Sequence, residues 1–343
     1  MQLVHASRRA SAHFRRSPMH GGAVPGLWLF KLHNEVKKRV PRSVSVYSEK
    51  KLVLEMTTLL NSRGWFGASS GLWSAKGKKS IVNNKTGGVL LPSGVTANTG
   101  SNYVEIKSEL DYQQQAWLPP GLESLYFVGG AIQVIGVFRS LGGAHLSGTA
   151  RDSSNGINIM GSVILGDGVD KITGISKNLA GSNGGFGVQN KGIIEMGGGN
   201  DVLIGESKAD SFMAIWNSGL INMGKGNDIV NAYNGGLSGG GYIEFGAGEN
   251  TLLGYGDMHV DGGGNAKSKL VLNPGTYTLA KQSGVYSSTG CFLVSLPVGI
   301  DGGSMSMLVD GFGIVKGIAG PASGLPLRAG VLQITASGVA SYL

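Results

Sequence analysis

Cysteine is almost absent from the chain, which holds one, Cys291, among 343 residues. A single cysteine excludes an intramolecular disulfide, and it excludes the Cys-x-x-Cys pair that redox centres and many zinc sites use. We expect Cys291 to be a small buried apolar residue rather than a reactive thiol.

Long apolar runs are also missing. The longest candidate, from Leu125 to Val137, is interrupted by Gly129 and Gly130, so it predicts buried strands rather than a membrane-spanning helix. The arginines of the first 16 residues are not followed by the apolar segment of a secretory signal. The sequence therefore predicts no transmembrane segment and no ordinary signal peptide.

Familiar catalytic motifs are lacking as well. The histidines form no His-Glu-x-x-His pair, and there is no Gly-x-Ser-x-Gly or P-loop pattern. Gly-x-Gly-x-x-Gly strings occur, but no βαβ unit surrounds them, which argues against a dinucleotide site. A polysaccharide-active β-helix enzyme would need paired carboxylates and a basic residue on one face, and the sequence shows no such set. We expect the protein not to be an enzyme.

Charge is unevenly distributed. The formal net charge is +8, and residues 1–60, with 11 Lys/Arg and 3 Asp/Glu, account for all of it, whereas residues 161–265 hold 5 Lys and 11 acids. Residues 1–60 are expected to form a basic, partly helical leader, with helical spacing from Leu27 to Val40 that Pro41 ends. No basic patch interleaved with aromatic residues follows, so no specific nucleic-acid partner is expected.

Glycine is abundant, with 60 residues, or about 17% of the chain against about 7% in average proteins. Disorder is disfavoured because 41% of the residues are apolar and only 15% are charged. The glycines must therefore separate packed segments, and they recur in four aligned copies of one pattern, which are GSVILGDGVDKITG (161–174), GIIEMGGGNDVLIG (192–205), GLINMGKGNDIVNA (219–232) and GYIEFGAGENTLLG (241–254).

These copies predict stacked coils. A motif that returns every 22 to 31 residues is typical of a solenoid, in which one coil cannot bury its apolar side alone. The apolar stretch before each Gly-x-Gly is expected to be a strand, and the Gly-x-Gly-x-Asp a corner. Stacking would place Leu165, Met196, Met223 and Phe245 in one column. It would place Asp170, Asp201, Asp228 and Asn250 in another.

A column of carboxylates at one edge is repulsive unless it is neutralised. Calcium takes about 6–8 oxygen ligands, including backbone carbonyls such as those of glycine-rich turns, whereas the absence of His and Cys from the motifs disfavours zinc. The candidate calcium ligands are the corner aspartates and the first and second glycines of each corner, namely Asp170, Asp201, Asp228, Gly166, Gly168, Gly197, Gly199, Gly224 and Gly226. The alternative is that the aspartates cap turns through hydrogen bonds to the backbone.

The segment GGGNDVLIG (197–205) resembles the nonapeptide G-G-x-G-x-D-x-U-x of repeats-in-toxin (RTX) proteins. The stretch 161–280 is similar to glycine-rich RTX-like repeats of large cyanobacterial secreted or surface proteins. The resemblance implies a parallel β-roll or β-helix, calcium at the Asp corners and type I export, which reads an uncleaved C-terminal segment such as GVLQITASGVASYL (330–343). A large apolar residue replaces the first consensus glycine in all four copies, and Asn250 replaces the aspartate in the fourth.

A second, shorter resemblance lies in WLFKLHNEVKKRV (28–40), which is similar to the W-x-x-x-x-H-N-x-V-N segment of flavin-dependent Erv/ALR sulfhydryl oxidases. In that family the His and Asn contact FAD. Trp28, His33, Asn34 and Val36 match, but Lys37 replaces the second Asn and the redox Cys-x-x-Cys is missing. The resemblance therefore does not predict this activity.

The expected fold is all-β, a parallel β-helix or β-roll-like solenoid. Its expected regions are the leader at 1–60, a strand-rich cap or linker at 61–150, the repeat solenoid at 151–280 and a C-terminal β cap at 281–343. The first function hypothesis is an extracellular or cell-surface, calcium-binding structural or adhesive protein, with cell-surface polysaccharide or another surface protein as partner. The alternative is a metal-independent virion or surface fibre that acts as a spacer.

Overall fold

The computed structural model describes strands at 72–73, 79–84, 89–91, 96–98 and 103–110, and residues 130–151, 154–177, 185–208, 213–282, 290–296 and 305–343. The chain divides into two compact units, residues 1–52 and 53–343, and every described residue belongs to the second. The predicted basic, partly helical leader and the segment similar to sulfhydryl oxidases lie outside the described residues.

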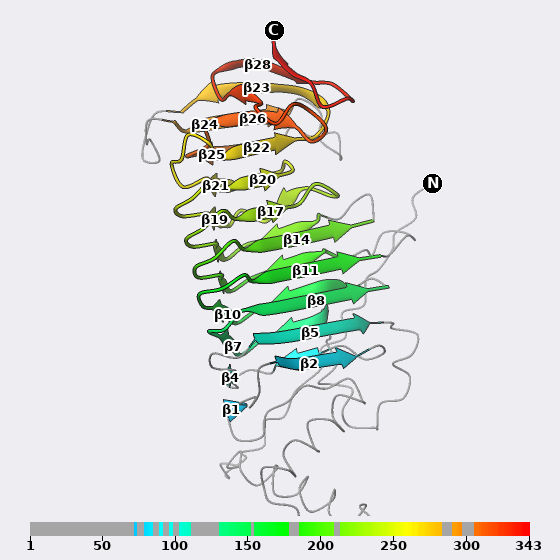
Figure 1. Ribbon diagram of the computed structural model, residues 1–343. Coiled ribbons are helices and arrows are strands. Elements are labelled where there is room, and N and C mark those ends of the chain that lie inside the picture. Colours follow the sequence, from blue (N-terminus) through cyan, green and yellow to red (C-terminus); the bar gives the residue numbers. More distant parts are fainter. Residues whose placement is uncertain are drawn as a thin grey trace, which may run out of the picture. The chain divides into compact units, whose positions relative to one another are not determined.

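The described part is all strand, arranged in three sheets (Figure 1). The first sheet contains, in spatial order, β1 (Leu72–Trp73), β4 (Thr96–Asn98), β7 (Val137–Ser140), β10 (Ser162–Leu165), β13 (Ile193–Glu195), β16 (Leu220–Asn222), β19 (Tyr242–Glu244), β21 (His259–Asp261), β25 (Met305–Asp310), β24 (Phe292–Leu296), β23 (Gly275–Lys281), β28 (Gly330–Ile334) and β29 (Ala340–Tyr342).

The second sheet contains β2 (Lys79–Asn84), β5 (Tyr103–Leu110), β8 (Ala144–Ala150), β11 (Lys171–Ser176), β14 (Val202–Ser207), β17 (Ile229–Asn231), β20 (Thr251–Leu253), β22 (Lys269–Leu272), β26 (Ile314–Gly317) and β27 (Leu325–Pro326). The third contains β18 (Leu237–Ser238), β15 (Ile215–Asn217), β12 (Val188–Asn190), β9 (Asn155–Ile159), β6 (Gly130–Val134) and β3 (Val89–Leu91).

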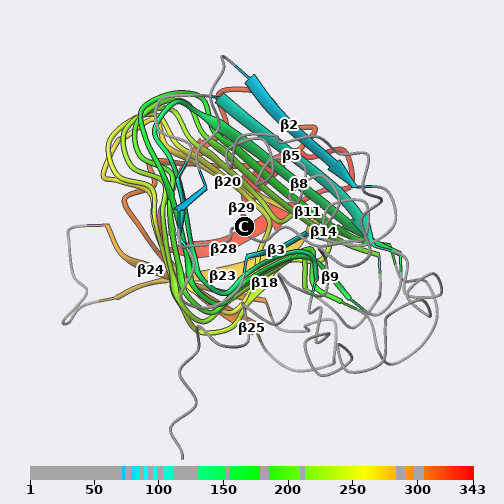
Figure 2. The same ribbon diagram turned by 90° about the horizontal axis from the view of Figure 1, so that it is seen from below.

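From β1 to β23, successive strands belong to different sheets, and each circuit of the chain pairs with the next. For example, β10, β11 and β12 pair in parallel with β13, β14 and β15, respectively. Viewed along the stack, the successive circuits lie over one another (Figure 2). The all-β, mainly parallel arrangement predicted from the sequence is therefore present.

The alternation of buried and partly exposed residues along the strands explains why the circuits stack. In β11 and β14 every second residue is buried, and the buried positions are paired between neighbouring strands. One resulting column, which lies in the core, consists of Leu146, Ile172, Leu203, Val230, Leu252, Leu270 and Val315. Complete burial of such a side chain contributes about 1.5–3 kcal/mol.

The apolar column predicted from the sequence is confirmed. Its four members are buried, and each directly follows a residue that is paired in parallel with its counterpart in the neighbouring coil. They are Leu165, Met196, Met223 and Phe245. The corner that follows them needs glycine. Gly199 has φ +142°, and a Cβ there would lie 1.5 Å from the carbonyl oxygen of Gly168, so only glycine lets the corners stack this closely.

The stack extends beyond the region that carries the motif. Strands from β2 to β8, within the region predicted to be a separate cap or linker at 61–150, pair within the same sheets as the repeats. Their corners lack the aspartate: Ala144, in SLGGAHL (140–146), stands where Asp170 stands in the next coil. The motif therefore marks only part of the stacked circuits.

The C-terminal end differs in pairing. Strand β25 pairs in parallel with β21, but beyond it β24, β23, β28 and β29 are added to the first sheet through antiparallel pairs, and β27 pairs antiparallel with β26. This antiparallel region starts at Gly275, close to the predicted start of the C-terminal β cap at 281. The described residues contain no helix long and apolar enough to cross a membrane.

Candidate functional site

The corner aspartates lie in line and are linked by a relay of hydrogen bonds. The backbone N–H of Asp170 donates to Oδ1 of Asp201 (2.8 Å), and the N–H of Asp201 donates to Oδ1 of Asp228 (2.9 Å). The relay starts at the N–H of Ala144, which donates to Oδ1 of Asp170. It continues from the N–H of Asp228 to Oδ1 of Asn250 (3.0 Å). The sequence therefore predicted the alignment of these side chains correctly.

The relay uses only one oxygen of each carboxylate. Asp170, Asp201 and Asp228 are fully buried, and Oδ2 of each has no hydrogen-bond partner among the described residues. An ionised carboxylate oxygen that is buried without a partner is strongly unfavourable. Each of these oxygens therefore needs either a proton or a cation.

Asn250 shows which groups face the second polar atom of the corner side chain, Oδ2 in the aspartates and Nδ2 in asparagine. Its Oδ1 takes part in the relay as the aspartates do, while its Nδ2 donates to the carbonyl oxygens of Gly246 and Gly262 (3.2 Å each). Gly246 is the first corner glycine of its copy, and the residues at the matching positions in the other copies are Gly166, Gly197 and Gly224. These glycines are among the predicted calcium ligands, and the aspartate Oδ2 atoms occupy the side-chain position that corresponds to Nδ2.

Burial changes the acidity of the column. Loss of solvent raises the pKa of Asp170 to about 6, that of Asp201 to about 7 and that of Asp228 to about 6. In each case the hydrogen bond from the backbone of the preceding coil opposes the shift. Asp201 lies between the other two, and their negative charges raise its pKa further.

The second set of predicted glycine ligands lies two residues after the first in each corner. Gly168, Gly199 and Gly226 all have positive φ, and the N–H groups of Gly199 and Gly226 donate to the carbonyls of Lys225 and Ala247 in the next coil. At the matching position in the fourth copy, the carbonyl oxygen of Gly248 accepts from the Ser268 hydroxyl (3.4 Å). This carbonyl thus also lies beside the polar column.

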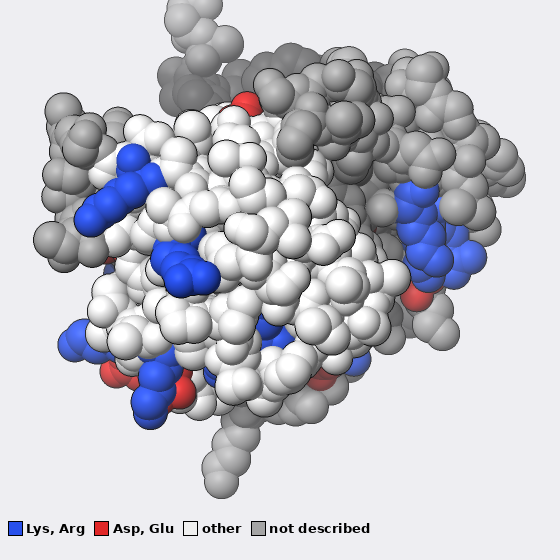
Figure 3. Space-filling view, turned by 90° about the horizontal axis from the view of Figure 1, so that it is seen from above, with Lys and Arg blue, Asp and Glu red and all other residues white. Residues whose placement is uncertain are grey.

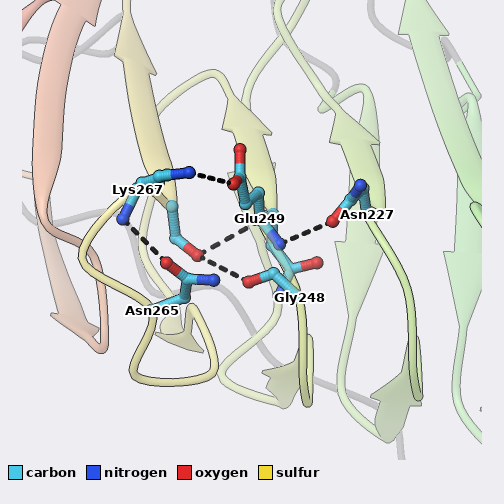
Figure 4. Close-up of polar contacts among 7 residues, drawn as sticks. Asn227, Gly248, Glu249, Asn265 and Lys267 are labelled. Atoms are coloured by element: carbon cyan, nitrogen blue, oxygen red, sulfur yellow. Dashed lines mark hydrogen bonds and ion pairs between the residues drawn. The ribbon is translucent and has the colours of Figure 1, made fainter.

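A second ladder, which the sequence reasoning missed, lies on the outer side of the corners (Figure 4). The N–H of Asn227 donates to Oδ1 of Asn200, and the N–H of Glu249 donates to Oδ1 of Asn227 (2.8 Å each). Glu249 in turn pairs with Lys267 at 2.8 Å, which lowers the pKa of Glu249. The sequence signal for this ladder was the asparagine that directly precedes the corner aspartate in two copies, Asn200 and Asn227.

A third ladder is a stack of two side-chain amides. Nδ2 of Asn190 donates to Oδ1 of Asn217 (2.8 Å), and both residues are fully buried. Oδ1 of each also accepts the N–H of the residue two positions on, Gly192 or Gly219. These contacts hold neighbouring coils together without any ion.

An outer row of acids also escaped the sequence reasoning. Glu244, Asp261 and Asp310 are paired in register on three neighbouring strands and line an open hollow together with corner glycines. The Tyr242 hydroxyl donates to Asp261 (3.4 Å), and the Tyr242 ring lies 4.7 Å from that of His259. Burial lowers the pKa of His259, against the opposing effect of Asp261 and Asp310.

The arrangement of acids limits what an ion could use. Among the described residues no group of three or more His, Cys, Asp or Glu is placed to hold a metal ion. A cation at the corners would therefore rely on one or two carboxylates together with backbone carbonyls.

At the C-terminal end of the stack the visible described surface is mostly uncharged, with basic side chains in small separate groups (Figure 3).

Comparison of the chain with protein-family models, with curated proteins and with solved structures gives no match. The functional interpretation therefore depends on the geometry of the corners.

Proposed function

We propose that the protein is an exported, non-catalytic structural or adhesive repeat protein, a parallel β-helix solenoid that calcium stabilises at its acidic corners. The observation that carries the proposal is the Oδ2 atom of Asp170, Asp201 and Asp228, which is buried and has no hydrogen-bond partner in the described part of the chain. Oxygen is the ligand that calcium prefers, and backbone carbonyls complete its coordination. Bound calcium would supply the positive charge that a buried carboxylate requires.

The resemblance to RTX repeats supports the same proposal and suggests how folding is linked to export. In a compartment with little calcium, three ionised carboxylates would oppose stacking, and the chain would stay competent for export. Outside the cell, calcium binding would contribute directly to the free energy of folding. The proposed partner is a cell-surface polysaccharide or another surface protein, bound along a stiff scaffold.

A calcium titration tests this proposal. We expect millimolar calcium to raise the melting temperature followed by circular dichroism at pH 7.5, because a ligand at about 100 times its Kd stabilises the folded state by about 2.7 kcal/mol. The control is the triple variant Asp170→Asn, Asp201→Asn, Asp228→Asn, which keeps the relay but removes the charge. Equal melting temperatures of the parent protein with calcium and with chelator would refute the calcium mechanism.

The second candidate is a metal-independent fibre or spacer. The observation that favours it is that the Asn190–Asn217 contact and the outer ladder join neighbouring coils through neutral groups. This candidate predicts that stability and any oligomers survive chelator unchanged. Sedimentation with and without chelator therefore separates the two functions.

A further inference from the structure

The polar column changes character along the stack. Its members are Asp170, Asp201, Asp228, Asn250 and Ser268, joined in that order by hydrogen bonds from each backbone N–H to the next side chain. All five are fully buried. The first three can carry a negative charge, whereas the last two are neutral.

The neutral members form hydrogen bonds with the surrounding carbonyl groups and need no ion. The Asn250 amide donates to the carbonyls of Gly246 and Gly262, and the Ser268 hydroxyl lies 3.0 Å from the carbonyl oxygen of Gly262 as donor. Ser268 also accepts the N–H of Asn250 at 3.2 Å. No side-chain atom of Asn250 or Ser268 is buried without a partner, in contrast to the three aspartates.

We propose that the side-chain amide of Asn250 takes the place of a calcium ion, so that the column of ions ends at Asp228. This inference rests on the proposed function. An amide N–H and a cation meet the same requirement, because both present positive charge to carbonyl oxygens. An aspartate at position 250 would set a carboxylate oxygen against the carbonyls of Gly246 and Gly262, which a cation would then have to bridge.

The identity of one residue per coil thus decides whether that coil binds an ion. A coil whose aspartate is ionised requires calcium, and a coil with asparagine is complete without it. The number of ions follows from the count of aspartates in the column rather than from the number of Gly-x-Gly corners.

Exchanging the two residue types in the full-length chain tests this inference. We expect Asn250→Asp to bind one calcium more than the parent in equilibrium dialysis and to melt at a lower temperature than the parent in chelator. We expect the reverse exchange, Asp228→Asn, to bind one calcium fewer and to melt at a higher temperature in chelator. The outer-ladder variant Asn227→Asp serves as the control and should leave the number of bound ions unchanged.

The outcomes distinguish the two proposals. If the parent binds calcium but Asn250→Asp binds no more, or Asp228→Asn no less, the role of Asn250 is refuted and the calcium scaffold stands. If Asn250→Asp does not fold even with calcium, Asp228→Asn decides: loss of one ion together with greater resistance to chelator supports the inference, and any other result overturns it. If neither the parent nor any variant binds calcium, the proposed function itself fails.

Discussion

At the scale of the residue, the corner position combines two tasks in one side chain. Oδ1 of each aspartate accepts a backbone N–H from the preceding coil and fixes the register, while Oδ2 is buried without a partner. The first task is independent of charge, since Oδ1 of Asn250 performs it as well. The second depends on charge, so we expect it to make the corner responsive to pH and, under the proposed function, to calcium.

The raised pKa values predict how stability depends on pH in the absence of calcium. The folded-state pKa values of about 6, 7 and 6 lie above the usual value of 3.8 for aspartate. The folded state therefore holds protons more tightly than the unfolded state, so stability is greatest at acidic pH and falls as the pH rises through about 6–7.

In chelator we expect a higher melting temperature at pH 5 than at pH 8, and a free energy of unfolding that is larger at pH 5 by on the order of 1–2 kcal/mol per carboxyl group. The triple Asp→Asn variant should lose most of this dependence. A parent protein that melts at the same temperature at both pH values would contradict the burial of these carboxyl groups.

The corner glycines give a second prediction at this scale. Gly199→Ala should destabilise the protein by more than about 2 kcal/mol, because φ is +142° and the new Cβ would overlap the carbonyl oxygen of Gly168. Its neighbour offers a matched control: at Gly198 the nearest atom to a new Cβ is the side-chain oxygen of Asp167, at 2.8 Å, which can move away. Urea unfolding of Gly199→Ala and Gly198→Ala should show a clear difference, and equal losses would argue against tight stacking of the corners.

The sequence predicted which residues align but not which way the aspartates face. Asp201 lies two positions before Leu203, and alternate residues of a strand share one face, so the inward direction of Asp201 follows from the burial of Leu203. That signal was available. The distribution of hydrogen bonds over Oδ1 and Oδ2 was not, because it depends on the distance between neighbouring coils.

At the scale of the element, the short strands are stabilised by packing against the strands of neighbouring coils rather than by contacts within each strand. β13, β16 and β19 have three residues each, and the middle residue of each is buried in register with its neighbours. One buried side chain per strand stabilises little alone, so each coil depends on the coils above and below it.

Truncation of one column member tests this dependence. Leu203→Ala should cost about 2–5 kcal/mol, because the side chain is fully buried between Ile172 and Val230 and its loss leaves a cavity. Val202→Ala, one position along the same strand and facing outward, should cost much less. Chemical denaturation measures both, and similar losses would show that the column does not carry the packing.

Strands upstream of the repeats were predicted as strands, but not as members of the same stack. The region 61–150 was predicted to be strand-rich, and β5 spans Tyr103–Leu110 within it. Its membership in the second sheet was not predictable because the coils before 161 lack the Gly-x-Gly-x-Asp signature, with Ala144 in place of the aspartate. Backbone pairing continues there although the side-chain motif does not.

At the scale of the whole molecule, three polar ladders run beside the apolar columns of the described part. Two of them, the Asn190–Asn217 stack and the outer ladder of Asn200, Asn227 and Glu249, are complete as they stand. The aspartate ladder alone contains buried oxygens that need a further partner. The account of function therefore depends on what occupies that position.

Calcium located directly in crystals of the full-length protein decides this point. X-ray data collected at long wavelength, where calcium scatters anomalously, should show a peak about 2.3–2.6 Å from Oδ2 of Asp170, Asp201 and Asp228, and none beside Asn250. An empty column in crystals grown with millimolar calcium, with each Oδ2 within hydrogen-bonding distance of a carbonyl oxygen, would contradict the account and identify the aspartates as neutral acids in a metal-free stack.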